Sequence, residues 1–234
     1  MKVSICIPAY KHPDFLKRCI DSVLTQDFSD YELIITDDSP DNTLQTLVNA
    51  YNDVRIRYIK NEKPLGSPEN WNKGLSLAKG QYIKILHHDD WFPNSHCLSR
   101  FVALLDNNPE ADIAFAASCD IDADKRQKIH IADKLFLDSL TKQPENLYLH
   151  NRLGAPSTCI FKNNKDYYFD INLKWLVDID FYIRIIKATP FVFSSEILVN
   201  IGISEFQITQ LCTADNNIRI VEKLYLFEKF RLNE

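Results

Sequence analysis

The chain has 234 residues, of which 45% are hydrophobic and 25% are charged, and its formal net charge is −5. This is the composition of an ordinary globular protein that can bury a sizeable core. The negative balance offers no basic surface to a nucleic acid polymer, so that class of partner is excluded. A nucleotide held through a metal ion stays compatible with this charge, because the metal supplies the positive charge.

The cysteines and the apolar runs bound the compartment. The six cysteines lie far apart and form no CxxC pair, so we expect reduced core residues in a reducing, cytoplasmic compartment. The apolar run at the N-terminus is too short for a signal peptide, and no window approaches the ~20 apolar residues of a membrane span. We therefore expect a soluble protein. Its last helix is the candidate for peripheral membrane contact, with docking on its own core as the competing interpretation.

Apolar runs and three-four spacings predict strands and helices that alternate through the first 118 residues. The predicted strands cover residues 3–8, 32–36, 54–59, 82–86 and 113–117, and the predicted helices cover 13–24, 44–51, 70–79 and 98–105. Such alternation implies right-handed βαβ units, and hence an α/β fold with a mainly parallel sheet.

Beyond Ser118 the alternation becomes irregular. We expect loops over 120–150 with one short helix near 132–140, then a strand at 157–161, a helix at 178–188, a strand at 191–201 and a last helix at 216–230. No stretch rich in Pro, Gly or Ser divides the chain. We therefore expect one domain over 1–234, with a nucleotide-binding half at 1–118 and an acceptor-binding half at 119–234.

Polar residues follow three of the predicted strands. They are Pro8-Ala9-Tyr10 after the first strand, Asp37-Asp38-Ser39 after the second, and His87-His88-Asp89-Asp90 after the fourth. In an open parallel sheet, ligands bind outside the carboxyl ends of the strands. The sequence therefore predicts that these residues share one edge of the sheet and one ligand.

The carboxylates at this edge match the needs of a transfer from a nucleotide-sugar. Negative charge grows on the diphosphate as it leaves, and a chain with little positive charge here needs a metal to stabilise it. Mg²⁺ and Mn²⁺ prefer oxygen ligands, which Asp89 and Asp90 supply. A separate carboxylate must deprotonate the acceptor hydroxyl. Asp178 or Asp180, at the start of a late helix, is the candidate, because a helix N-terminus favours the ionised form.

The order of these motifs resembles that of the GT-A-fold, family 2 inverting glycosyltransferases. The matching segments are SICIPAY at 4–10, SVLTQDFSDYELIITDDS at 22–39, the Asn and Gly residues between 61 and 74, AKGQYIKILHHDDW at 78–91, GAPSTCIF at 154–161 and VDIDFYIR at 177–184. The resemblance covers almost the whole chain and is densest over residues 3–91. It implies a nucleotide-sugar donor, UDP-linked by preference, a glycan or lipid-linked acceptor, and a place in surface polysaccharide synthesis.

The resemblance also implies a role for each matching residue. Its nucleotide-binding positions fall on Pro8, Ala9, Tyr10, Asp37, Asp38, Asn70 and His88. Asp89 takes the metal position of the family's DxD motif, with Asp90 beside it, and Asp178 takes the position of the general base.

Three positions depart from the family pattern. His87 replaces the first acid of DxD, and Val177 replaces the acid before Asp178. In the segment 201–209, Ser204 stands where some relatives place a histidine. These departures leave open which side chains complete the metal site.

Each motif also has a purely structural interpretation. Asp37 and Asp38 could form a polar turn that caps the next helix, and the Asp89-Asp90 and Asp178-Asp180 pairs could also be helix caps. A zinc site at His87 and His88 is disfavoured, because adjacent strand residues point to opposite faces. Trp91 and Trp175 could pack on acceptor sugars or in the core.

Two other functions compete with a transferase. A catalytically silent nucleotide-sugar-binding subunit would explain the altered DxD. A nucleotidyltransferase would need an early Gly-rich, basic phosphate loop, and this chain shows none. Its five glycines form neither a GxGxxG turn nor a GxxxxGK loop, which excludes a dinucleotide-dependent dehydrogenase and a P-loop kinase.

Overall fold

The first half of the chain folds into alternating strands and helices, as predicted. The computed structural model describes residues 1–207, 212 and 215–232. Apolar runs form the strands, and Pro13 opens the first helix at the position where a missing N–H costs nothing. The elements in order are β1 (Val3–Ala9), α1 (Pro13–Leu24), β2 (Tyr31–Asp37), α2 (Thr43–Asn49), β3 (Ile56–Lys60), α3 (Glu69–Leu77), β4 (Tyr82–Ile85) and α4 (Cys97–Asp106).

The second half adds strands and helices in a less regular order. Its elements are β5 (Ile113–Ile121), β6 (Gln127–His130), α5 (Lys134–Lys142), the 3-10 helices η1 (Pro144–Tyr148) and η2 (Pro156–Thr158), β7 (Cys159–Lys162), α6 (Val177–Ala188), β8 (Phe191–Gly202) and α8 (Asn216–Phe230). The prediction of loops over 120–150 was wrong for β6. The first three of the four β6 residues are exposed, and Ile129 is the apolar one among the four. This edge strand therefore lacks the buried apolar pattern by which the other strands were predicted.

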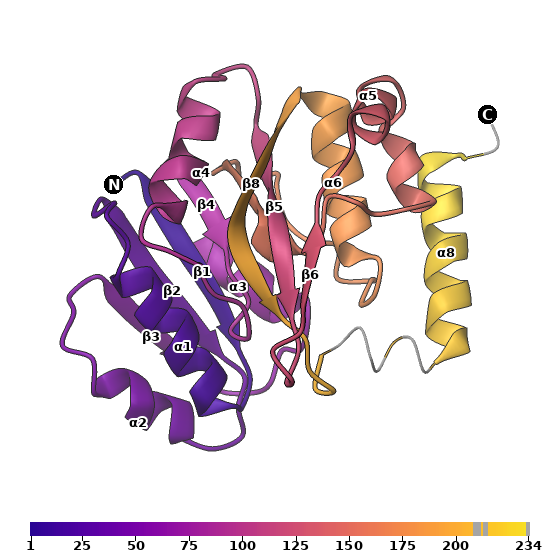
Figure 1. The fold of residues 1–234 in the computed structure, drawn as a ribbon. Helices are drawn as coiled ribbons and strands as arrows, with labels where there is room; N and C mark the ends of the chain where they lie inside the picture. The colour runs from indigo at the N-terminus through magenta and orange to yellow at the C-terminus, as the bar shows by residue number, and fades with distance from the viewer. Residues whose placement is uncertain (208–211, 213–214, 233–234) are drawn as a thin grey trace.

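All strands join one eight-stranded sheet, in the order β3-β2-β1-β4-β7-β5-β6, with β8 beside β5 (Figure 1). The pairs among β1, β2, β3 and β4 are parallel, and so is β5 with β8. β7 and β6 pair in succession along β5, opposite residues 113–115 and 118–121, and both are antiparallel to it. The carboxyl ends of β1, β2 and β4 therefore lie at one edge, as predicted from their parallel alternation.

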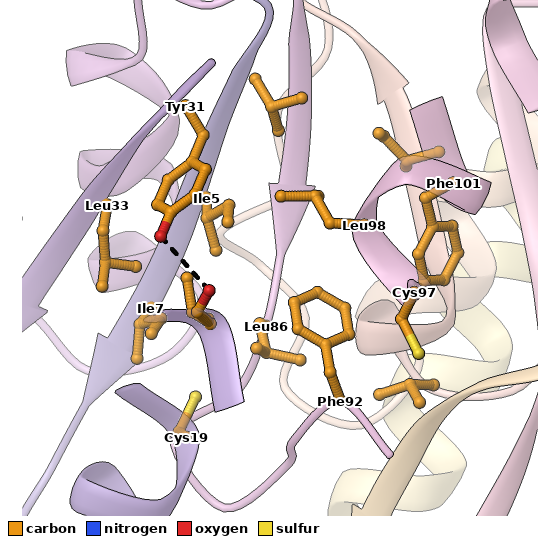
Figure 2. Packing of buried hydrophobic residues seen from close by; sticks show 14 of the residues in the cluster. Ile5, Ile7, Cys19, Tyr31, Leu33, Leu86, Phe92, Cys97, Leu98 and Phe101 are labelled. Carbon is orange, nitrogen blue, oxygen red and sulfur yellow. Dashed lines mark hydrogen bonds between the residues drawn. The ribbon is translucent and has the colours of Figure 1, made fainter. Parts of the chain in front are cut away.

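Two hydrophobic clusters cover the two faces of the sheet. Ile5 and Ile7 belong to a cluster that includes residues of α1, α2 and α4, whereas Cys6 belongs to a cluster with α3, α5, α6 and α8. This division follows from the alternation of side chains along a strand. Figure 2 shows the first cluster, in which Tyr31 donates a hydrogen bond to the backbone oxygen of Val23 at 3.2 Å. Helices on both faces of the sheet complete a three-layer α/β/α sandwich.

The six cysteines are all free thiols and buried, as expected for core residues. In the described part of the chain, no helix combines the length and the apolar character that a membrane crossing requires. The last helix, α8, packs its Leu226 into the second cluster, and its Ile220, Val221 and Leu224 are exposed.

Candidate active site

A cavity of about 690 Å³ opens where the carboxyl ends of β1, β2 and β4 meet the start of α6. Its volume lies in the range of small-molecule sites. The sequence-predicted residues that line it are Pro8, Ala9, Tyr10, Asp38, Asn70, His88, Asp89, Asp90 and Asp178. Residues far apart in the sequence thus surround one space. A smaller hollow of about 170 Å³, on α4 and β8, contains none of them.

The turn after β1 forms one wall of this cavity. Lys11 and His12 both have left-handed backbones, with φ of 54° and 52°, a conformation that is unfavourable for residues other than glycine. Such strain clusters at functional sites, where the surrounding structure holds it. The turn ends at Pro13 and leaves Tyr10 46% exposed at the cavity.

Asp38 organises the loop that follows β3. Its carboxylate accepts hydrogen bonds from the backbone N–H groups of Leu65 at 3.1 Å and Gly66 at 2.7 Å, and from the amide of Asn61 at 2.6 Å. Asn61 also donates to Asn70, whose own amide donates to the backbone oxygen of Thr36 at 3.0 Å. Asp38 and Asn70 therefore line the cavity as parts of one braced network.

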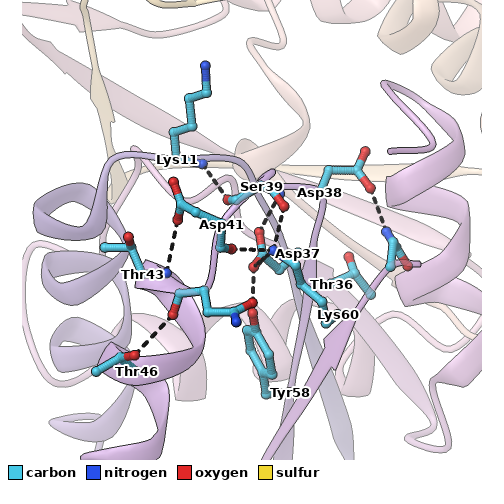
Figure 3. Close-up of polar contacts among 12 residues, drawn as sticks. Lys11, Thr36, Asp37, Asp38, Ser39, Asp41, Thr43, Thr46, Tyr58 and Lys60 are labelled. Carbon is cyan, nitrogen blue, oxygen red and sulfur yellow. Dashed lines mark hydrogen bonds and ion pairs between the residues drawn. The ribbon is translucent and has the colours of Figure 1, made fainter. Parts of the chain in front are cut away.

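Asp37 does not line the cavity and is completely buried. Figure 3 shows its carboxylate among Tyr58, Lys60 and Ser39: it accepts from the Tyr58 hydroxyl, from the Lys60 ammonium at 3.1 Å and from the Ser39 N–H at 2.7 Å. Ligand-binding was predicted for this residue, and its position corrects that prediction, because every contact above is structural. The polar-turn alternative holds for Asp37, although neither it nor Asp38 caps α2, whose N-cap is Asn42.

The turn after β4 gathers three candidate metal ligands. One ligand atom from each of His87, Asp89 and Asp90 lies within 4.8 Å of the other two. The Nε2 atom of His87 is buried without a hydrogen-bond partner, and no hydrogen bond to the Asp89 carboxylate occurs among the described residues. Two carboxylates and an imidazole with open positions fit a divalent ion such as Mn²⁺ or Mg²⁺. The helix-cap interpretation of Asp89 and Asp90 was wrong, because α4 begins at Cys97.

The two histidines diverge, as the alternation argument predicted, even though both follow the end of β4. The His87 ring packs on Trp71 with 4.5 Å between ring centroids. The His88 ring stacks toward His12 at 6.4 Å and lies against Phe15 at 6.5 Å. Only His87 joins the carboxylates, which makes it a candidate ligand that the sequence argument had disfavoured.

Contacts from other elements hold the acidic turn in place. The Arg18 guanidinium of α1 donates to the backbone oxygen of Asp89 at 2.8 Å, and the N–H of Gly202 donates to the Asp90 carboxylate at 3.1 Å. A Cβ atom on Gly202 would lie 2.4 Å from the Asp89 oxygen, so only glycine allows β8 to approach this closely. Burial and the neighbouring Asp89 charge raise the pKa of Asp90 well above its usual value.

Beneath this turn lies a fully buried lysine. Lys84 donates to the backbone oxygens of Ile85, at 2.9 Å, and of Ser157. Its ammonium lies 4.6 Å from the ring centroid of Phe101. Burial lowers the pKa of Lys84 to about 8, and its positive charge offsets a part of the rise in the pKa of Asp90.

Asp178 lies in the first turn of α6 and lines the cavity. Its carboxylate accepts from the amide of Asn151 and from the N–H of Ile179, both at 2.9 Å. Burial raises the pKa of Asp178 to about 6, which is suited to a base that works near neutral pH. The helix N-cap is Leu176, so Asp178 does not cap α6. Asn151 is a support for this carboxylate that no sequence motif indicated.

Asp180 does not line the cavity, and its side chain is completely buried. It pairs with Arg184 one turn along α6 at 2.8 Å and with Lys229 of α8 at 2.7 Å. Asp178 and Asp180 lie two positions apart on a helix and therefore point in different directions. Asp180 thus joins two helices, and the structure corrects its prediction as a catalytic residue.

Further residues line the cavity without having been predicted as site residues. Trp175, which was considered as a sugar contact, does line it, whereas Trp91 packs beneath the Arg18 guanidinium at 3.5 Å. The other residues include Lys11, His12, Trp71, Lys174, Ser204 and Phe206. Of the segment 201–209, residues 208 and 209 lie outside the described part of the chain.

Comparison with known proteins identifies relatives of this chain. A relative in Escherichia coli, the putative colanic acid biosynthesis glycosyl transferase WcaA, is 30% identical over 200 residues, which are 79% of this chain and 66% of that protein. Another E. coli protein, UDP-Glc:alpha-D-GlcNAc-diphosphoundecaprenol beta-1,3-glucosyltransferase WfaP, is 38% identical over 90 residues, 38% of this chain and 36% of that one. The chain thus spans at most about two thirds of these relatives.

The fold has a counterpart among solved structures. The crystal structure of S. aureus TarS 1–349 in complex with UDP-GlcNAc matches with a TM-score of 0.70 and 21% identity, over 90% of this chain and 61% of that one. This likeness identifies the architecture as that of GT-A glycosyltransferases. The model of the family described as "Glycosyl transferase family 2" matches residues 4–175. The chain with this acid-lined cavity is therefore a member of glycosyl transferase family 2.

Proposed function

We propose that the protein is an inverting, metal-dependent glycosyltransferase that moves a sugar from a nucleoside diphosphate-sugar to a glycan or lipid-linked acceptor. The observation that carries this proposal is the convergence of Asp38, Asp89 and Asp178, from three separate elements, on one cavity of about 690 Å³. UDP is the favoured nucleotide, since relatives and structural neighbours with UDP-sugars in their names include WfaP and TarS. The names of WcaA and WfaP, which refer to colanic acid biosynthesis and to a diphosphoundecaprenol acceptor, also support a role in surface polysaccharide synthesis. We place this role at the cytoplasmic side of a membrane.

In the proposed arrangement the donor nucleotide occupies the part of the cavity formed by residues 1–118. Pro8, Ala9 and Tyr10 lie along the base, and Asp38 with Asn70 holds the loop that closes over it. The acceptor enters against residues 119–234, where Trp175 offers an aromatic face to a sugar ring. His88 belongs to the turn after β4, and its ring faces His12 of the β1 turn, on the donor side. Each of the residues named in this arrangement borders the same cavity.

The reaction is a single in-line displacement. Asp178 accepts the proton of the acceptor hydroxyl while the hydroxyl oxygen forms a bond to the anomeric carbon. The bond from that carbon to the β-phosphate oxygen breaks, and its electron pair leaves with the nucleoside diphosphate. Attack from the side opposite the leaving group inverts the anomeric configuration. A divalent ion held by Asp89 and Asp90, with His87 as a further ligand, would neutralise the charge on the leaving diphosphate.

The replacement Asp178→Asn tests the base. It keeps the size of the side chain and one oxygen that can accept from Asn151 or Ile179, but it cannot accept a proton. We expect release of UDP from UDP-glucose or UDP-GlcNAc, with water or a glycan as acceptor, to fall by about 100-fold or more. Calorimetry should show unchanged binding of UDP with Mn²⁺. Asp138→Asn, an exposed carboxylate on α5, is the matched control, and normal turnover in Asp178→Asn would remove this residue from the mechanism.

A catalytically silent nucleotide-sugar-binding subunit is the second candidate function. The observation in its favour is the imidazole of His87 at the first position of the acidic motif. Burial lowers the pKa of His87 to about 4, so this side chain is neutral at pH 7 and brings no negative charge to the ion. Binding of UDP with Mn²⁺ by the native protein, without any turnover of UDP-, GDP- or dTDP-sugars, would favour this candidate.

A further inference from the structure

A buried glutamate of the last helix holds the segment that leads into the catalytic helix. Glu222 of α8 is 5% exposed. Its carboxylate accepts hydrogen bonds from three successive backbone N–H groups: Lys174 at 2.8 Å, Trp175 at 2.9 Å and Leu176 at 2.8 Å. These residues lie outside regular secondary structure, immediately before α6. A carboxylate with three N–H donors is a strong, charge-assisted anchor.

The anchored segment forms one wall of the cavity, whereas the helix that anchors it does not. Lys174, Trp175, Val177 and Asp178 line the cavity, and no described residue of α8 does so. Asp178 follows the last anchored amide by two positions. The place of Trp175 and Asp178 therefore depends on a carboxylate that itself never reaches the cavity.

Two further contacts from α8 hold the same segment on either side of Glu222. The Arg219 guanidinium lies over the Trp175 ring, 5.4 Å from its centroid. At the other end of the helix, Lys229 pairs with Asp180 at 2.7 Å, two positions after Asp178. α8 thus contacts the segment before Asp178 and also Asp180, two positions after it, which leaves little freedom for the carboxylate between them.

We propose that Glu222 is a positioning residue, which holds Trp175 and Asp178 in the geometry that the acceptor side of the reaction needs. This role rests on the proposed glycosyl transfer with Asp178 as base. Glu222 touches neither substrate nor the reacting atoms. Its effect is expected on the turnover step and not on donor binding, because the donor side of the cavity comes from β1, β2 and β4.

The replacement Glu222→Gln tests this role, since it keeps the side-chain volume and removes one of the two charged oxygens that accept. With UDP-glucose or UDP-GlcNAc and Mn²⁺, we expect kcat for UDP release to fall by about tenfold, because small displacements of catalytic groups have large effects on rate. The KM for the donor and the calorimetric affinity for UDP should stay within twofold of the native values. Glu228→Gln, exposed on the same helix, should change none of these.

The fluorescence of Trp175 gives a readout that needs no activity. We expect acrylamide to quench Glu222→Gln more strongly than the native protein, and this difference should vanish when both carry Trp175→Phe. A native-like quenching and a native kcat in a folded Glu222→Gln protein would overturn the proposal and leave Glu222 as a simple anchor for α8. Failure of the native protein to turn over any donor would instead overturn the proposed function, while the quenching experiment would still decide whether Glu222 holds Trp175.

Discussion

At the scale of single residues, the cavity makes the ionisation of one carboxylate unfavourable. Asp178 is partly buried, and its pKa is raised to about 6, whereas an aspartate in an unfolded chain titrates near ~3.9. Ionisation of this side chain therefore opposes folding. Its contribution to stability is greatest below pH ~3.9, and it is lost as the pH rises through about 6.

This linkage predicts that Asp178→Asn is more stable than the native protein at neutral pH. The free energy of unfolding at pH 7 should rise by about 1–3 kcal/mol, since each pKa unit corresponds to ~1.4 kcal/mol. The advantage should shrink below pH 6 and disappear near pH 4. Urea denaturation of both proteins at pH 4, 5, 6, 7 and 8 measures it. An equal or lower stability of Asp178→Asn across this range would show that the ionised Asp178 carboxylate does not reduce the free energy of unfolding.

The same titration sets the pH dependence of turnover. The proposed base must be ionised, so activity should increase with pH through about 6 and level off above it. The neighbouring carboxylates of Asp89 and Asp90 are the proposed ligands of the metal ion. The increase of activity with pH is therefore best measured under saturating Mn²⁺ and UDP-sugar.

At the scale of secondary structure, α8 joins the body of the protein through charges as well as apolar packing. Lys229 pairs with Asp170 at 2.5 Å and with the completely buried Asp180 at 2.7 Å. Tyr225 also donates to Asp170, at 2.8 Å. Burial by itself raises the pKa of Asp170, but the hydrogen bonds from Lys229, the Asn172 N–H and Tyr225 outweigh it and hold this pKa well below its usual range. The helix is thus docked on its own core, as the simpler sequence interpretation held.

We predict that Lys229→Met destabilises the protein by about 2–4 kcal/mol, because removal of one partner leaves a buried carboxylate without part of its compensation. The free energy of unfolding in urea at pH 7 measures the loss. Lys223→Met is the matched control, since Lys223 is exposed on the same helix and has no ion pair among the described residues. The two replacements should differ by at least ~1 kcal/mol, and equal effects would contradict the role of the Asp180 pair.

At the scale of the whole molecule, donor and metal should act as one ligand. We expect UDP with Mn²⁺ at about 100 times its dissociation constant to stabilise the fold by ~2.7 kcal/mol, which corresponds to a rise in Tm of roughly 5–10 °C. Differential scanning calorimetry measures the shift. EDTA should abolish most of it, and Asp89→Asn should lose the part that depends on Mn²⁺. A full shift in Asp89→Asn would exclude Asp89 from the metal site.

The sheet was predictable because its strands carry their own signal. Every residue of β1 and of β2 is buried, and each strand is mostly apolar and lies next to a turn. The strand predicted to start at Val54 begins instead at Ile56, because Val54 is wholly exposed before the sheet. β6 escaped prediction since it is an exposed edge strand, whose pairing depends on β5 and not on its own residues.

The cavity was predictable to the extent that parallel strands bring their carboxyl ends together. That rule located Asp38 and Asp89, but it could not separate Asp37 from Asp38, because the two adjacent residues differ only in the side to which they point. Asn151 and Glu222 act through contacts across 27 and 46 to 48 residues of sequence. No local pattern carries such contacts, so their roles needed the folded structure.

The lysine beneath the acidic turn affects whether the metal site forms before the ion binds or only with it. Lys84 supplies a positive charge within the core next to Asp90. Arg18 and Gly202, from two other elements, donate hydrogen bonds to Asp89 and Asp90 of the turn. Repulsion between the paired acids is thus partly balanced by the polypeptide itself. We expect the turn that carries Asp89 and Asp90 to be preorganised before any ion binds, so that donor and metal bind without rearranging it.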